Sequence, residues 1–245
     1  MNQTIHRILK GQADRFPNKE AIRAPGRTAL DYQSLTLQVD SIVERLNTLG
    51  IGRGERVAIV LPNGPEMAVA FLAVASCATS APLNPAYRAS EFDFYLSDLN
   101  ARALMLAEGV NSPAREIAQA RGIPILEVTR KPDDAAGVFH LTETSGGTAS
   151  VASFAGPDDV ALVLHTSGTT SRPKIVPLTH RNICTSAFNT ATTLQLTEDD
   201  CCLNVMPLFH IHGLMAAVLA KLTPFREVAY FQHLTVIHAR RNRSA

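Results

Sequence analysis

The stretch Val160-Ala-Leu-Val-Leu-His-Thr-Ser-Gly-Thr-Thr-Ser-Arg-Pro-Lys-Ile-Val-Pro-Leu178 decides the fold expected for this chain. It begins with a short continuous apolar run, Val160 to Leu164, which is typical of a buried strand. Apolar residues resume at Ile175, and a polar segment rich in hydroxyl side chains lies between the two runs. The stretch therefore predicts a buried strand, a polar loop and a second apolar segment in direct succession.

The polar loop has the composition that a polyphosphate requires. Its hydroxyl and backbone groups donate hydrogen bonds, its glycine allows close approach of the backbone, and its lysine adds a compact positive charge. A flexible surface loop can have a similar composition, but such loops usually lack patterned apolar flanks. We interpret the loop as a nucleotide phosphate site, with the candidate residues Thr166, Ser167, Gly168, Thr169, Thr170, Ser171 and Lys174.

Two common phosphate motifs are excluded. A Walker loop has glycine immediately before its lysine and serine or threonine after it, whereas Pro173 and Ile175 flank Lys174 here. The glycine-rich segment Gly50-Ile-Gly-Arg-Gly54 follows a helical pattern and has Val57 at the place of the third glycine of a dinucleotide fingerprint. The loop is thus neither an ordinary P-loop nor part of a dinucleotide site.

Strand and helix patterns alternate along the chain, which predicts an α/β fold with mostly parallel sheets and helices on both faces. Residues 130–157 are rich in Asp, Gly, Ser and Thr and are expected to form a linker or surface loop, with a subdomain break there. Helices are expected over 5–16, 32–49, 66–77, 114–121 and 179–193 and after His212, and strands over 20–23, 28–30, 56–61, 103–106, 124–128, 160–164 and 201–206.

Composition excludes several classes of protein. With 23 basic and 22 acidic residues the formal net charge is +1, which gives no electrostatic case for nucleic-acid binding. No apolar run reaches the length of a membrane span, and no secretory signal is recognisable at the start. The four cysteines lack the spacing of metal ligands or a disulfide framework, so we expect reduced, mostly buried thiols and an intracellular location.

The residues Thr166 to Lys174 resemble the signature loop of the AMP-forming acyl-CoA synthetase, or adenylate-forming, superfamily. Pro207-Leu-Phe-His-Ile-His-Gly213 is similar to the next motif of that family, as are the upstream segments Val57 to Asn63 and Ala81 to Pro85. The resemblance extends to about Leu222. It implies that the chain is a truncated amino-terminal domain of the adenylate-forming fold.

Within the superfamily the chain is most similar to the oxalate–CoA ligase group, because His165 precedes the loop and Ser171-Arg172 stand where most members have Gly-x. Ile175 departs from both patterns, since the family usually has glycine after the lysine. A β-branched residue does not readily take positive φ. If the loop needs a positive φ at position 175, the isoleucine would alter the loop geometry.

The resemblance implies a two-step reaction in which a carboxylate attacks ATP to give an acyl-adenylate and pyrophosphate, after which coenzyme A displaces AMP. By position, residues 166–171 and Lys174 would hold the β and γ phosphates, with Mg²⁺ bridging phosphate oxygens. His210 would lie beside the acyl carboxylate and α-phosphate, and His212 would line the acyl pocket. A purely structural role for His210 remains the alternative, and no third ligand suggests a metal site.

The tail 223–245 is basic, has no recognised counterpart in the family and ends without a peroxisomal address. We expect a truncated or frame-shifted product, 1–222 being a partial AMP-binding domain. The missing part would carry the adenine, ribose and Mg²⁺ contacts, so the fragment alone should be inactive. A non-catalytic nucleotide-binding relative and a nonfunctional product are the alternatives. The acyl substrate and the choice between cytoplasm and peroxisome stay open.

Overall fold

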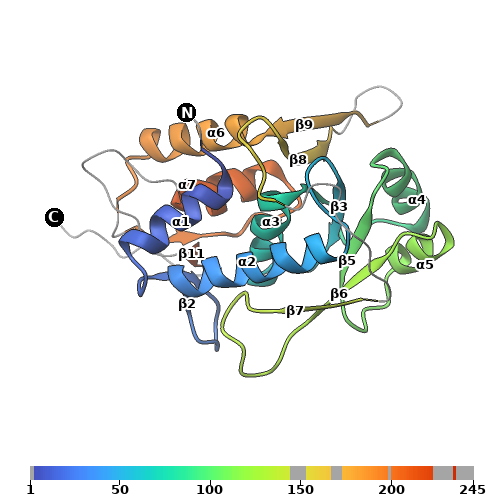
Figure 1. The fold of residues 1–245 in the computed structure, drawn as a ribbon, viewed down its shortest axis with the longest axis horizontal. Helices are drawn as coiled ribbons and strands as arrows, with labels where there is room; N and C mark the ends of the chain where they lie inside the picture. Colours follow the sequence, from blue (N-terminus) through green and yellow to red (C-terminus); the bar gives the residue numbers. More distant parts are fainter. Residues whose placement is uncertain (1–2, 144–152, 167–172, 198–199, 223–233, 236–245) are drawn as a thin grey trace.

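Eleven strands build the two sheets of the computed structural model, which describes residues 3–143, 153–166, 173–197, 200–222 and 234–235 (Figure 1). They are β1 (Glu20–Arg23), β2 (Leu30–Asp31), β3 (Arg56–Val60), β4 (Thr79–Pro82), β5 (Ala103–Ala107), β6 (Ile125–Thr129), β7 (His140–Glu143), β8 (Val160–His165), β9 (Ile175–Thr179), β10 (Cys202–Leu203) and β11 (Leu234–Thr235).

The larger sheet has seven strands in the order β7-β6-β5-β3-β4-β8-β9. The five inner strands run parallel, and the edge strands β7 and β9 are antiparallel to their neighbours. The smaller sheet has the order β10-β11-β1-β2. Because parallel strands need crossover connections, helices must cover the larger sheet.

The helices are α1 (Ile5–Arg15), α2 (Tyr32–Thr48), α3 (Pro65–Cys77), α4 (Ala89–Asp98), α5 (Pro113–Ala120), α6 (His180–Thr193), a π-helical segment η1 (Gly213–Leu219) and α7 (Ala220–Leu222). Alternate residues of the inner strands enter two different cores. Val57 and Ile59 pack in the core with α1, α2, α3 and α6, whereas Ala58 and Val60 pack in the core with α4 and α5. Helices therefore cover both faces, and the predicted α/β class is confirmed (Figure 1).

Local sequence signals explain where the long helices begin and end. The Asp31 side chain accepts a hydrogen bond from the Ser34 N–H at the start of α2, as its N-cap position predicts. After the last turn of α2, Gly50 has φ +75°, a left-handed conformation that glycine takes at little cost. Thr179 and Asn182 form a capping box at the start of α6.

Four elements, β4, α4, β7 and β10, differ from the expectation. The short strand β4 and the helix α4 were not predicted. Strand β4 is part of the larger sheet, and α4 packs against that sheet. The linker expected over 130–157 is wrong for His140–Glu143, because β7 pairs there with β6. The strand expected over 201–206 is confined to Cys202–Leu203. Each of these errors concerns a segment without a continuous apolar run.

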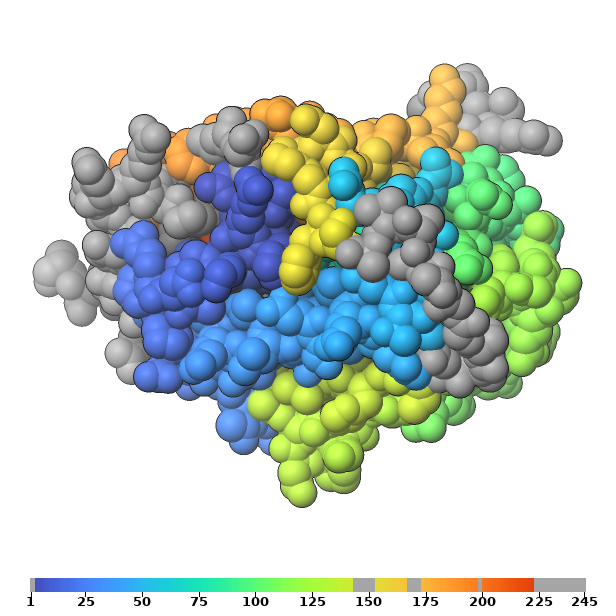
Figure 2. Space-filling view, viewed as in Figure 1, coloured from blue at the N-terminus to red at the C-terminus, as the bar shows by residue number. Residues whose placement is uncertain are grey.

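The amino-terminal helices form one face of the molecule. Figure 2 shows α1 and α2 in blue across this face, with the yellow segment after residue 152 lying against them. The ring of His6 in α1 stacks on Phe154 at a centroid distance of 3.6 Å. At the first residue of α1, the Ile5 N–H donates to Nδ1 of His180, which is fully buried. Helix α1 is thus attached to segments far away in the sequence.

Two further expectations concern the cysteines and the membrane. Cys77 and Cys184 are buried, but Cys201 is exposed and Cys202 only half-buried, so the expectation of mostly buried thiols holds for two of the four. None of these four described residues forms a disulfide. No helix within the described ranges combines the length and the apolar character that crossing a membrane would require.

Candidate nucleotide-binding site

The base of the predicted phosphate loop is a closed hairpin. Strand β8 delivers Thr166 at its carboxyl end, and β9 begins directly after Lys174. The Thr166 N–H donates to the Lys174 carbonyl (3.0 Å), and the Lys174 N–H lies 3.4 Å from Oγ1 of Thr166. Both residues are exposed. The structure thus brings together the two ends of the loop, while the other candidates, Ser167, Gly168, Thr169, Thr170 and Ser171, lie outside the described residues.

Ile175 does not need the conformation of a glycine. It is the first residue of β9 and pairs directly with His165 of β8, and its φ is not in the left-handed region. Its side chain packs on the core that contains α4 and α5. The expected conflict between a β-branched residue and the loop geometry is therefore absent at this position, because the backbone is an ordinary strand.

His210 and His212 lie on the connection between β10 and η1, and both are exposed. The His210 N–H donates to the Pro207 carbonyl, which forms a turn. A Cβ added to Gly213 would lie 2.7 Å from the Pro207 carbonyl oxygen, so only glycine fits where η1 begins against this turn. The turn and the glycine together fix the course of the segment that carries the two histidines.

Asn63 attaches this histidine segment to the larger sheet. Its Oδ1 accepts a hydrogen bond from the Leu208 N–H at 3.0 Å, across 145 positions of sequence. Asn63 follows the carboxyl end of β3, and Leu208 is buried. Sequence reasoning did not identify Asn63 as a site residue. The available signal was its place at the end of Val57 to Asn63, one of the segments similar to the family.

The two halves of the candidate site lie at the same edge of the sheet. Strands β3, β4 and β8 are adjacent and parallel, so the Asn63 loop and Thr166 both follow carboxyl ends. Ligands of open α/β sheets bind at this edge. Among the described residues, however, no hydrogen bond or ion pair joins His210 or His212 to Thr166 or Lys174.

His165 is the second residue whose contacts sequence reasoning missed. Its side chain is 6% exposed, and its Nε2 lies 3.1 Å from Oδ2 of Asp98, the last residue of α4. Burial lowers the pKa of His165, and the hydrogen bond and charge of Asp98 oppose this effect only in part. The ring is therefore neutral at neutral pH, and because a carboxylate oxygen accepts, Nε2 is the protonated nitrogen.

A hollow of about 490 Å³ lies at the carboxyl ends of β3, β5 and β6, beside Asn63 and the start of α3. Here the connections of neighbouring strands leave to opposite faces, which is where α/β folds place ligands. Arg27 lines the hollow but is paired with Glu66 and donates to the carbonyl of Ala135. Asn63, which accepts from the Leu208 N–H, is one of the residues that line the hollow, and none of them was predicted as a ligand.

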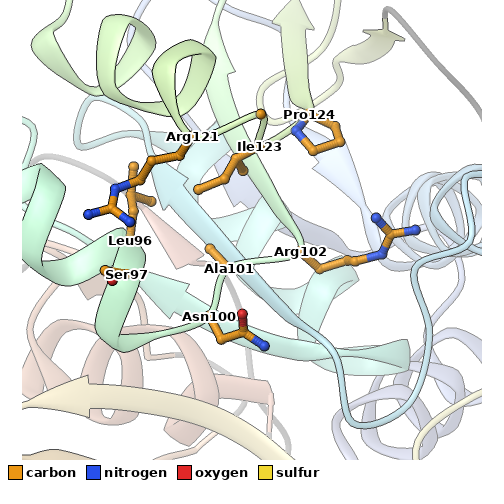
Figure 3. A pocket seen from close by; sticks show the side chains of 9 residues that line it. Leu96, Ser97, Asn100, Ala101, Arg102, Arg121, Ile123 and Pro124 are labelled. Atoms are coloured by element: carbon orange, nitrogen blue, oxygen red, sulfur yellow. The ribbon is translucent and has the colours of Figure 1, made fainter.

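A second hollow, of about 310 Å³, lies at the opposite end of β5 and β6 (Figure 3). Arg102 and Arg121 point to different sides of it (Figure 3), and each already has a carboxylate partner: Glu55 at 3.2 Å and Asp93 at 2.8 Å. The amino ends of strands are not where open α/β sheets bind nucleotides. We therefore do not assign the nucleotide to this hollow.

The described residues contain no group of three His, Cys, Asp or Glu side chains that could hold a metal ion. His210 and His212 thus have no third ligand among the residues that the structure describes. Lys174 is exposed and makes no ion pair with a described residue, so its ammonium group is available to an anion. The arrangement fits a site that binds phosphate oxygens with hydroxyls, amides and one positive charge.

Comparison with known proteins shows the family of this chain. The model of the family described as AMP-binding enzyme matches residues 9–233, which extends past Leu222, where the resemblance was expected to end. The chain is 39% identical to an oxalate–CoA ligase of Arabidopsis thaliana, over 90% of this chain and 44% of the relative. It is also 39% identical to an oxalate–CoA ligase of Saccharomyces cerevisiae, over 69% of this chain and 35% of the relative.

The fold is similar to that of a solved structure of low sequence identity. The apo structure of MatB from Rhodopseudomonas palustris superposes with a TM-score of 0.76 at 23% identity, covering 97% of this chain and 45% of that protein. The chain spans less than half the length of these three relatives. Since the family model covers most of its residues, the chain belongs to the family of AMP-binding enzymes.

Proposed function

We propose that this chain forms the phosphate-binding part of an ATP-dependent carboxylate–CoA ligase that acts through an acyl-adenylate. The observation that carries the proposal is the closed hairpin base, which presents Thr166 and Lys174, both exposed, at the carboxyl edge of a parallel sheet in a chain of this family. Coenzyme A and a small carboxylic acid would be the further substrates.

The loop would act by neutralising charge. Thr166, Ser167, Gly168, Thr169, Thr170 and Ser171 would donate to the β and γ phosphates, and Lys174 would neutralise the oxygens that become pyrophosphate. In reactions at phosphorus, positioning and charge neutralisation supply most of the acceleration. Mg²⁺ would enter with ATP and bridge its phosphate oxygens. The described residues offer no cluster of metal ligands, so we assign none of them to the metal.

His210 would orient the acyl carboxylate and donate to a nonbridging oxygen of the α-phosphate. Its exposure and its fixed turn support this role, because an exposed ring on a constrained backbone can reach a ligand. His212 would contact the acyl group and could donate to a second carboxylate. The two relatives named oxalate–CoA ligase make oxalate the first acid to test.

The test is isotope exchange between pyrophosphate and ATP in the presence of oxalate and of a panel of other acids. We expect negligible acyl-CoA formation by residues 1–245 alone, because the chain spans less than half of its relatives. We expect exchange when residues 1–222 are joined to the carboxy-terminal part of the Arabidopsis relative. If a folded chimera with native-like circular dichroism shows no exchange with any acid of the panel, the ligase proposal is contradicted.

The closed base of the loop would also serve a second candidate, a nucleotide-binding protein without catalysis. Titration of residues 1–245 with ATP separates the two cases from a nonfunctional product. The non-catalytic candidate would be favoured if the chain binds ATP, Lys174→Ala abolishes that binding, and the chimera shows no pyrophosphate exchange. No binding at all would indicate that this chain alone does not function as a nucleotide site. The location, cytoplasmic or peroxisomal, is not decided by either measurement.

A further inference from the structure

His165 joins the hairpin beneath the predicted phosphate loop to helix α4. Its Nε2–H donates to Oδ2 of Asp98 at 3.1 Å, and its ring meets Tyr95 edge to face at a centroid distance of 4.6 Å. Both partners lie on α4, one turn apart. The imidazole is only 6% exposed, whereas the carboxylate of Asp98 is 38% exposed, so the bond joins a nearly buried ring to a surface side chain. His165 is thus held from two directions.

The contacts continue away from His165 to the loop that follows β4. Tyr95 stacks on Tyr87 at 4.8 Å, and Tyr87 in turn meets Phe92 edge to face. Aromatic pairs in these arrangements add stability beyond the area they bury. We use the name brace for Tyr87, Tyr95, Asp98 and His165, which connect the hairpin, α4 and the segment after β4.

The backbone connects His165 directly to the two ends of the phosphate loop. His165 pairs with Ile175 across the hairpin, and the next residue on each side closes the loop through the Thr166 N–H and the Lys174 carbonyl. Ile175 packs on the same core as the brace. Both residues at this rung differ from the usual family pattern, and the structure makes them cross-strand partners. A change at His165 would therefore move Thr166 and Lys174.

We propose that His165 is a positioning residue for the phosphate loop, which it fixes against α4 through Asp98 and Tyr95 so that Thr166 and Lys174 keep the spacing that a triphosphate needs. The proposal rests on the function proposed above. His165 itself does not touch the nucleotide in this scheme. Its effect is to keep Thr166 and Lys174 at a fixed spacing before ATP binds, which lowers the cost of ordering these two residues on binding.

Four variants of the 245-residue chain test the brace. His165→Phe keeps a ring against Tyr95 but loses the donor, whereas His165→Gln places an amide N–H near the former Nε2. Asp98→Leu removes the acceptor from the other side. The matched control is His140→Phe, since His140 is also a histidine beside an aspartate, with Nε2 3.7 Å from Oδ2 of Asp134, but lies on the distant edge strand β7.

The first readout is the dissociation constant for ATP with Mg²⁺, measured by calorimetry. We expect about five- to tenfold weaker binding for His165→Phe and Asp98→Leu, because each variant loses the hydrogen bond that holds the nearly buried ring of His165 to α4. The double variant should be no weaker than either single one, because both remove the same contact. His165→Gln should recover most of the affinity, and His140→Phe should bind like the wild type.

The second readout needs no nucleotide. Hydrogen exchange of the Thr166 amide should accelerate in His165→Phe and Asp98→Leu, while the amides of Val57 and Leu104 in the sheet stay protected and show that the fold is intact. Unchanged exchange at Thr166 would overturn the brace, whatever the chain binds. If exchange accelerates but wild type and Lys174→Ala bind ATP equally, the proposed function fails while the brace stands. Normal affinity in His165→Phe, with Lys174→Ala impaired, would overturn the positioning role alone.

Discussion

The buried imidazole of His180 should make the stability of this chain depend on pH above the range where carboxylates titrate. His180 is fully buried, and its Nδ1 accepts the Ile5 N–H at 3.2 Å, so the neutral form with a protonated Nε2 is the one that fits. Burial lowers the pKa of His180 from 6.5 to about 4, although the nearby Ala75 carbonyl and Asp159 act in the opposite direction. Protonation would leave the Ile5 N–H without its acceptor.

The sign and size follow from proton linkage. Because the pKa is lower in the folded protein, the unfolded chain binds more protons between pH 4 and 6.5, so the free energy of unfolding falls as the pH falls through this window. Each pKa unit corresponds to about 1.4 kcal/mol, and the full shift to about 3 kcal/mol. From pH 7 to 5, where most carboxylates remain ionised, His180 alone should remove about 2 kcal/mol.

Urea unfolding followed by circular dichroism from pH 7.5 to 5 measures this effect. The comparison is with His180→Asn, whose Oδ1 can replace Nδ1 as the acceptor for Ile5 but does not titrate. The stability advantage of the wild type over this variant should shrink by about 2 kcal/mol between pH 7 and 5. His140→Asn makes the same replacement at an exposed histidine and serves as the matched control. Parallel stability curves for the wild type and His180→Asn would refute the reasoning.

Three further changes test the candidate site in an active chimera. Lys174→Ala should slow pyrophosphate exchange by about 100-fold or more. The free energy of unfolding should change by less than about 0.5 kcal/mol, because the side chain is exposed. An unchanged exchange rate would remove Lys174 from the mechanism. Asn63→Leu should lose the acceptor for the Leu208 N–H and slow exchange, whereas Asn63→Asp should retain it; equal rates would show that this contact does not position His210. Gly213→Ala should destabilise the chain by about 1–3 kcal/mol, as urea unfolding would show, because the new Cβ meets a backbone oxygen; a neutral effect would show that the turn can shift.

The parts of the fold that sequence predicted are those with a strong local signal. The runs at β3, β5 and β8 are continuously apolar, and α2 repeats its apolar residues at helical spacing between Asp31 and Gly50. Such segments encode their own structure, because the period of the apolar residues and the capping residues agree. The same is true of the first loop flank, Val160 to Leu164, whose continuous apolar run lies in β8.

Strand β4 could not be found in this way. Its four residues, Thr79 to Pro82, contain two hydroxyl side chains and a proline, and nothing in their composition indicates a strand. They are buried because β3 and β8 flank them. Their burial therefore depends on the assembled sheet and not on the segment's own sequence. Pro82 is tolerated here as the last residue of the strand, although proline usually avoids central strands.

Helix α4, in contrast, had a signal. Phe92, Tyr95, Leu96 and Leu99 recur at the spacing of one helical face, and the Glu91 side chain accepts from the Arg88 N–H at the start of the helix. The mixed polar residues between them weaken the pattern when it is read along the chain. Missing this helix also meant missing Asp98 and Tyr95, and therefore the surroundings of His165.

The two departures from the family pattern show why the sequence alone does not reveal the whole site. Taken separately, His165 is a mark of a subgroup and Ile175 is an unfavourable replacement of glycine. In the folded chain they form one cross-strand pair, with Ile175 packed on the core that also receives Tyr95. A β-branched residue in a strand loses less conformational entropy on folding than glycine would, and it packs against its neighbours. The replacement that cast doubt on the loop from sequence therefore gives the hairpin a firmer base, and the histidine opposite it is the residue whose removal would show how far that base controls the loop.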